Sequence, residues 1–168
     1  MKTTLNWEKG IFKSTFKIYS ENILVGKLQE ISFSQSTDGE LNGKSYCFRT
    51  QGFFKQEAQI IDSENGSTIG KITYNSRMKK AKIEYSDRVV NLKYNNAWNT
   101  KWSLCDLEGV QINYHGSSTK GKIEYDTQND LLALAGLFIT NYFRQITFAV
   151  CIAVFTTAFA TIFITVLK

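Results

Sequence analysis

The side chains that could perform acid–base or nucleophilic chemistry are few and scattered in this 168-residue chain. Its single histidine, His115, falls on the polar side of an alternating run and has no acid or cysteine beside it. A lone exposed histidine of this kind is typical of a surface residue. Because general-base catalysis needs a histidine or a close carboxylate pair in a pocket, the sequence predicts a protein that is not an enzyme. The carboxylates fall mostly at expected turns: Glu57, Asp62, Glu64, Asp87, Asp106 and Glu108.

The cysteines give no sign of a metal or cofactor site. Cys47 and Cys105 are distant from one another, and Cys151 lies inside a long apolar run. Two distant cysteines without a framework spacing could pair, but they are more typical of free thiols. No group of residues has metal-ligand spacing, and no glycine-rich phosphate loop precedes a helix. We therefore expect no metal and no cofactor.

The densest positive patch is the run from Arg77 to Lys82, and the chain as a whole has a formal charge of +5. A moderately basic domain suits an anionic partner, and a membrane anchor would favour anionic lipid over nucleic acid. Each basic side chain near such a surface contributes about 1 kcal/mol. An ordinary solvated hairpin remains the alternative interpretation of this run. The candidate headgroup-binding residues are Arg77, Lys79, Lys80, Lys82 and Arg88.

A long apolar run near the end of the chain supplies the expected anchor. The run from Ile146 to Leu167 contains no charge and meets the length of about 20 residues that a membrane span requires. We therefore predict a transmembrane helix over residues 146–168, with Arg144 and Lys168 at the two membrane interfaces. The first residues contain no apolar signal segment, which predicts a tail-anchored protein whose domain faces the cytoplasm.

From Leu5 to Asp126 the dominant period of apolar residues is two, which indicates strands with one dry face. Val90 and Leu92 alternate with polar residues, as do the runs around Ile112 and Ile123. Trp98 and Trp102 share one parity and are predicted to face the core together. Short turn signals separate these runs, so we expect an antiparallel meander of about a dozen strands over residues 1–145. The chain contains no proline to protect sheet edges, which favours a closed β-barrel.

A second apolar segment, Leu131 to Ile139, is too short to cross a bilayer. It is apolar on every side, and Asn129 and Asp130 supply a helix cap and a carboxylate at its start. A helix that is apolar all round must be surrounded by apolar material. We therefore predict a core helix at about 129–143 that fills the barrel. The polar residues from Asn141 to Gln145 are expected to separate it from the transmembrane helix.

These features together resemble the tubby C-terminal-like superfamily, which includes phospholipid scramblases and LURP-one-related proteins. The resemblance implies a closed barrel around a hydrophobic C-terminal helix and a setting at a membrane. The phosphoinositide-binding residues of tubby proteins have no counterpart that can be placed here, so no lipid site is carried over. The matching segments are the hairpins at Phe16–Leu28 and Ile60–Ile72, the turn at Leu104–Val110 and the helix start at Asp130–Ala135.

Two functions remain open at this point. The first is a membrane-anchored, non-catalytic barrel that binds the anionic headgroups of membrane lipids, with a possible scramblase-like ancestry. The second is a tail-anchored adaptor that binds a protein partner and has no role in lipid binding. The sequence predicts no nucleic-acid partner, and it does not name a protein partner.

Overall fold

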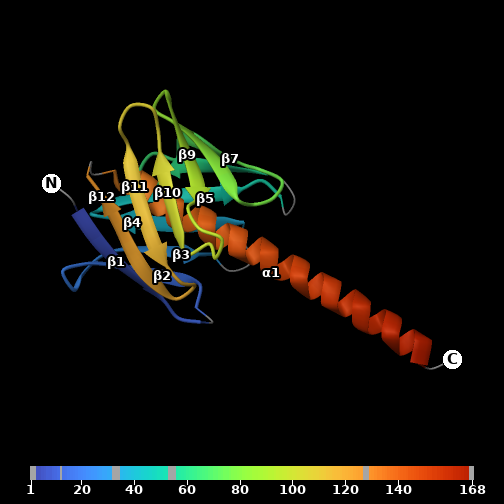
Figure 1. The fold of residues 1–168 in the computed structure, drawn as a ribbon. Helices are drawn as coiled ribbons and strands as arrows, with labels where there is room; N and C mark the ends of the chain where they lie inside the picture. The colour runs from blue at the N-terminus through green and yellow to red at the C-terminus, as the bar shows by residue number, and fades with distance from the viewer. Residues whose placement is uncertain (1–2, 12, 32–34, 53–55, 127–128, 167–168) are drawn as a thin grey trace.

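A closed antiparallel barrel of twelve strands and a single long helix make up the fold (Figure 1). The computed structural model describes residues 3–11, 13–31, 35–52, 56–126 and 129–166, and their side chains as far as residue 160. The strands are β1 (Thr3–Lys9), β2 (Thr15–Ser20), β3 (Ile23–Glu30), β4 (Ser36–Leu41), β5 (Lys44–Thr50), β6 (Glu57–Asp62), β7 (Thr68–Tyr74), β8 (Lys80–Tyr85), β9 (Arg88–Tyr94), β10 (Lys101–Cys105), β11 (Gln111–Gly116) and β12 (Lys120–Tyr125). The helix is α1 (Asp130–Val166).

Each strand pairs with its neighbours in the chain, and the first strand closes the ring by pairing with the last. In that closing pair Leu5 lies opposite Ile123, and Thr3 lies opposite Tyr125. The predicted meander and its closure are therefore confirmed. Because closure leaves no free edge among these strands, the barrel does not need proline at an edge to prevent further strand pairing.

The alternation in the sequence corresponds to an inward and an outward face of the wall. Ile83 and Leu92 point into the core, and Trp102 is fully buried there. Trp98 corrects the prediction that both tryptophans face the core, because it lies in the β9–β10 connection and is 85% exposed. The Asn96 side chain accepts hydrogen bonds from the backbone N–H groups of Thr100 and Lys101, both at 3.0 Å. This turn lies between Trp98 and the start of β10. The alternation of inward and outward side chains along β10, which buries Trp102, therefore does not extend to Trp98.

The first part of α1 fills the barrel, as predicted. All residues from Leu131 to Phe143 are buried, and the helix contacts β4 and β5 on one wall and β10 and β11 on the opposite wall. The Phe138 ring stacks on Phe48 with 4.8 Å between ring centroids. The expected cap is also present, because the Asn129 side-chain oxygen accepts a hydrogen bond from the backbone N–H of Leu132 at 3.1 Å.

The predicted separation into two helices is wrong: α1 runs without a break for 37 residues, and among the described residues no separate transmembrane helix follows it. Asn141 and Gln145, which were expected to interrupt the helix, instead bond to Glu30 on the barrel rim. With those polar groups satisfied and no proline present, the helix continues out of the barrel (Figure 1). It is long and apolar enough to cross a membrane, by length and composition.

Candidate functional site at the helix exit

The direction of the strands decides which connections surround the emerging helix. Lys9 ends β1 and Glu30 ends β3, and both contact Asn141, where α1 leaves the barrel. Because neighbouring strands are antiparallel, every odd-numbered strand ends at this side. We call this end the exit rim and the opposite end the far rim. The exit rim comprises the described residues of the connections, which are 10–11, 13–14, 31, 35, 51–52, 56, 75–79, 95–100 and 117–119, together with the strand residues that flank them.

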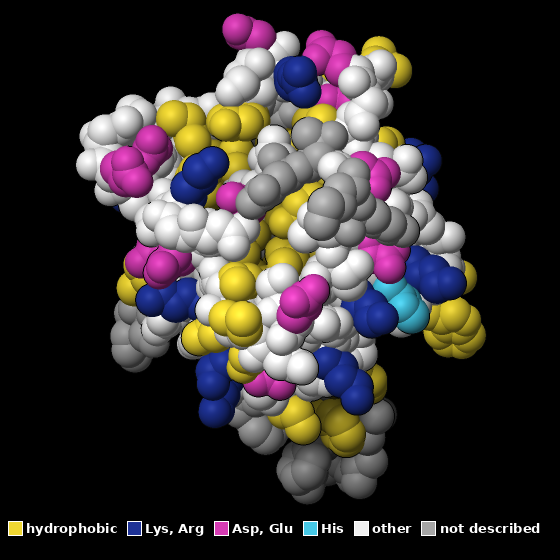
Figure 2. Space-filling view, turned by 90° about the vertical axis from the view of Figure 1, so that its left-hand side faces the viewer, with side chains coloured by type: hydrophobic (Ala, Val, Ile, Leu, Met, Phe, Trp, Pro, Cys, Tyr) yellow, Lys and Arg dark blue, Asp and Glu magenta, His cyan; other side chains and the backbone are white. Residues whose placement is uncertain are grey.

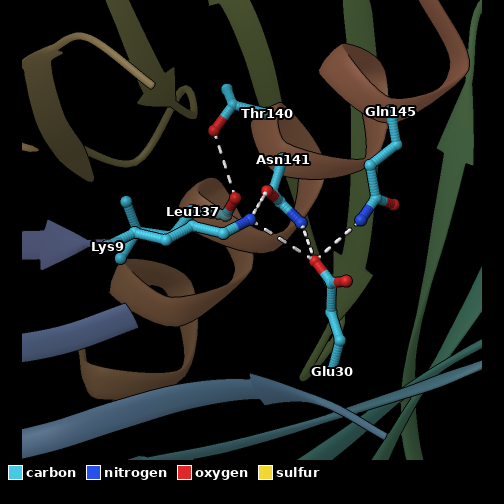
Figure 3. Close-up of polar contacts among 6 residues, drawn as sticks. All are labelled: Lys9, Glu30, Leu137, Thr140, Asn141 and Gln145. Atoms are coloured by element: carbon cyan, nitrogen blue, oxygen red, sulfur yellow. Dashed lines mark hydrogen bonds and ion pairs between the residues drawn. The ribbon is translucent and has the colours of Figure 1, made fainter. Parts of the chain in front are cut away.

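A polar cluster fixes the helix at the exit rim (Figure 3). The Glu30 Oε1 atom accepts hydrogen bonds from the side-chain amides of Asn141 and of Gln145, the latter at 2.7 Å. Lys9 Nζ donates to the Asn141 Oδ1 atom at 2.8 Å and lies 3.7 Å from Glu30 Oε1. Burial lowers the pKa of the Lys9 ammonium, while the Glu30 carboxylate acts in the opposite direction. These contacts join two strand ends to two successive turns of α1, and so they set its depth and rotation.

Arg144 lies between Asn141 and Gln145 in the chain and was predicted to lie at a membrane interface. Its guanidinium lies over the ring of Trp102, 5.6 Å from the ring centroid, and is partly buried. Such a cation–π contact is favourable when the cation is partly desolvated. Arg144 therefore stands where α1 passes from the barrel to the exterior. The other predicted interface residue, Lys168, lies outside the described residues.

The five predicted headgroup-binding residues do not form one patch. Arg77, Lys79 and Lys80 are exposed at the exit rim, in the β7–β8 connection and at the first residue of β8. Lys82 lies further along β8 and is paired with Glu84. Arg88 begins β9 at the far rim, where its Nε atom lies 3.0 Å from a carboxylate oxygen of Glu108.

The Asn75 side chain shapes this part of the rim. Its Oδ1 atom accepts hydrogen bonds from the backbone N–H groups of Lys79 and Lys80, at 2.8 and 2.9 Å. Met78 takes a positive φ of 50° in the same turn. The turn therefore holds three basic side chains together at the end of the barrel from which α1 emerges.

Sequence reasoning missed that the charges separate along the barrel axis. Among the described rim residues, the exit rim has only two acidic ones, Glu30 and Glu57, and the far rim only two basic ones, Lys44 and Arg88. Figure 2 views the side opposite the emerging helix, where acidic side chains are visible together with basic ones. The basic residues of the exit rim are Lys9, Lys13, Arg77, Lys79, Lys80, Lys101 and Lys120. The acidic residues of the far rim are Glu21, Asp62, Glu64, Asp87, Asp106, Glu108 and Asp126.

Exposed apolar side chains do not distinguish the two ends. Ile11 and Trp98 project from the exit rim with 78% and 85% of their surface exposed. Ile23 and Leu107 are comparably exposed at the far rim. Charge, and not apolar exposure, is therefore what makes the exit rim different.

A groove of about 320 Å³ lies between the exit rim and the helix. The helix contributes Phe138, Asn141, Tyr142, Gln145 and Ile146 to its lining. The rim contributes Ser14, Glu30, Ile31, Gln35, Ser36, Thr37, Thr50 and Gly52.

The other candidates for chemistry remain dispersed. His115 is exposed, as predicted. Within the described ranges no group of three or more histidine, cysteine, aspartate or glutamate side chains could hold a metal ion. In comparisons with known proteins, no family model, no curated protein and no solved structure matches this chain.

Proposed function

We propose that this protein is a membrane-anchored, non-catalytic β-barrel whose exit rim binds the anionic headgroups of the membrane that α1 enters. The observation that carries the proposal is the charge separation along the barrel axis. The basic end is the end from which the apolar helix leaves. A barrel seated this way presents its positive side to the lipid surface and its negative side away from it.

The continuous helix supports this seating, since no flexible linker lies between the barrel and the exposed apolar segment. The part of α1 beyond Phe143 is about 34 Å long at about 1.5 Å per residue, which matches a hydrocarbon core of about 30 Å. If that part spans the bilayer, the exit rim is held at the level of the headgroups. Its charges then lie within the screening length of about 8–10 Å at ordinary salt.

The rim charges also favour one orientation in the membrane. The cytoplasmic leaflet carries the anionic lipids, so a basic rim at the membrane surface is attracted to that side. The fold brings Lys9, Arg77 and Lys101 from distant parts of the chain to the end of the barrel where the proposed span begins. In this proposal residues 1–145 therefore face the cytoplasm and residues 146–168 form the anchor.

The architecture supports the resemblance to the tubby C-terminal-like superfamily. A closed twelve-stranded barrel surrounds the start of a hydrophobic C-terminal helix, as that resemblance implies. We propose membership of that superfamily on this basis. The lipid contact that we assign rests on the exit rim of this chain and not on residues carried over from relatives.

The test uses the full chain in nanodiscs and the fluorescence of Trp98, because Trp7 and Trp102 are buried and give a constant background. We expect brominated phosphatidylserine to quench Trp98 more than brominated phosphatidylcholine, and we expect salt to reduce the difference. The double substitution Arg77→Glu, Lys79→Glu should abolish the preference.

The matched control is Lys44→Glu with Arg88→Glu, which reverses the same charge at the far rim and should leave the preference intact. Equal quenching by the two lipids, or equal effects of the two double variants, would contradict the proposal. A stoichiometric protein partner recovered in pull-downs, together with the absence of any lipid preference, would support the adaptor function instead.

A further inference from the structure

The groove at the exit rim has a floor that continues into the proposed span. Phe138, Tyr142 and Ile146 lie on successive turns of α1 and all three line the groove. Ile146 is also the first residue of the uncharged run outside the barrel. A lipid whose chains lie along that run therefore has its headgroup at the height of the groove.

The edge of the groove is polar and rich in acceptors. Both amide side chains and Lys9 contact the same Glu30 oxygen, Oε1, and none of these contacts uses Oε2 (Figure 3). Tyr142 also lines the groove, but its hydroxyl is buried away from it. Thr37 and Thr50 add hydroxyls to the lining.

This chemistry differs from that of the rim surface. Among the described residues that line the groove, Glu30 is the only carboxylate, and none is a lysine or arginine. A carboxylate oxygen with spare capacity attracts an ammonium group that can donate hydrogen bonds. A volume of about 320 Å³ is at the lower end of the range for ligand sites, which suits one headgroup and not a whole lipid.

We propose that the groove holds the headgroup of one ethanolamine phospholipid, with its amine at Glu30 and its chains alongside Ile146. This inference rests on the proposed seating of the exit rim at the membrane. It concerns a single zwitterionic lipid in the groove, whereas the rim charges attract anionic lipid over a whole surface.

The test is native mass spectrometry of the full chain in detergent with added phosphatidylethanolamine or phosphatidylcholine. The two headgroups have the same charge, but the quaternary amine of phosphatidylcholine has no N–H to donate. We expect one tightly retained phosphatidylethanolamine and about tenfold weaker retention of phosphatidylcholine. Glu30→Gln should remove this difference. Glu57→Gln, at the same rim but outside the groove, should preserve it.

A second pair of variants covers the case in which Glu30→Gln fails to fold. Ile31 lines the groove and is 40% exposed, so Ile31→Trp should obstruct the groove with little strain. Ile11→Trp is the control on an exposed residue outside the groove. Equal retention of the two lipids by the wild type, or unchanged selectivity in Ile31→Trp, would overturn the inference. Neither result depends on phosphatidylserine, so the proposed rim function is judged separately.

Discussion

The hydroxyl of Tyr114 donates a hydrogen bond to the backbone carbonyl of Leu132 at 2.9 Å, and so it joins strand β11 to helix α1 inside the barrel. The same hydroxyl lies 3.3 Å from the carbonyl oxygen of Ala133. The Tyr114 ring occupies the space beside Gly136, where an added Cβ would overlap the ring. One wall residue therefore holds the helix through both a polar and a steric contact.

We expect Tyr114→Phe to destabilise the barrel by about 1 kcal/mol, because the ring is kept and only the hydroxyl is lost. Urea unfolding of the full chain in detergent measures this difference. Tyr19→Phe is the control, since the Tyr19 hydroxyl bonds to Glu8 on the exposed outer face. If the two substitutions have equal effects, the internal hydrogen bond does not stabilise the helix in the barrel.

The buried phenols predict a loss of stability at alkaline pH. Burial raises the pKa of Tyr114 well above the ordinary value of 10.0, and it does the same for Tyr74. Above pH 10.0 the unfolded chain therefore releases protons that the folded chain retains, so the unfolding free energy falls as pH rises past that value. Urea unfolding at a series of pH values measures the slope, and Tyr114→Phe should make it shallower. A slope that is the same in both proteins would contradict this origin.

Gly136→Ala separates helix propensity from packing. In an open helix the change would stabilise by about 1 kcal/mol. Here the new methyl group meets the Tyr114 ring, so we expect a loss of about 1–3 kcal/mol in the free energy of unfolding. The partner substitution Tyr114→Val removes the obstructing ring, and the double variant should show that the two effects are strongly coupled. A stabilised single variant would contradict the tight contact.

The unbroken helix predicts that the barrel follows the anchor as a rigid body. Seven alanines inserted after Gln145 extend α1 by about 10 Å, which lifts the exit rim to about one screening length from the headgroups. We expect the preferential quenching of Trp98 by brominated phosphatidylserine to fall sharply. A flexible glycine–serine insert of equal length should lose less, because the rim can return to the surface. Equal quenching with both inserts would indicate that the helix bends near Gln145.

The sequence predicts the barrel well, because every strand places one face on the core and the period of two is therefore visible at residues such as Ile83 and Leu92. The core helix is equally visible, since a segment that is apolar on every side requires apolar surroundings. Trp98 shows the limit of this reasoning. Trp98 and Trp102 are an even number of residues apart, which within one strand would place them on the same face. The alternation holds only within a strand, and Trp98 lies in the turn that Asn96 forms.

Contacts between distant residues account for the features that could not be predicted. The polar residues Asn141 and Gln145 suggested an interruption because their partner, Glu30, is more than 100 residues away in the sequence. The five basic residues looked like one patch because they are close in sequence. A meander places alternate turns at opposite ends, which separates Arg77 from Arg88. The order of strands and turns could be predicted from the sequence. Assigning alternate turns to opposite ends of the barrel would have predicted the charge separation along its axis.

Helix α1 forms the core of the barrel and also continues outside it, so a pull on its outer part is transmitted directly to the core. A force that pulls the barrel away from the membrane in which the outer part of α1 is proposed to lie acts along the helix axis. The stacked ring pair Phe48–Phe138 and the Glu30–Asn141 contact lie beside that axis, so such a force loads them in shear and all at once. The barrel would resist extraction of its own core. A torque on the outer helix would turn the whole barrel with it.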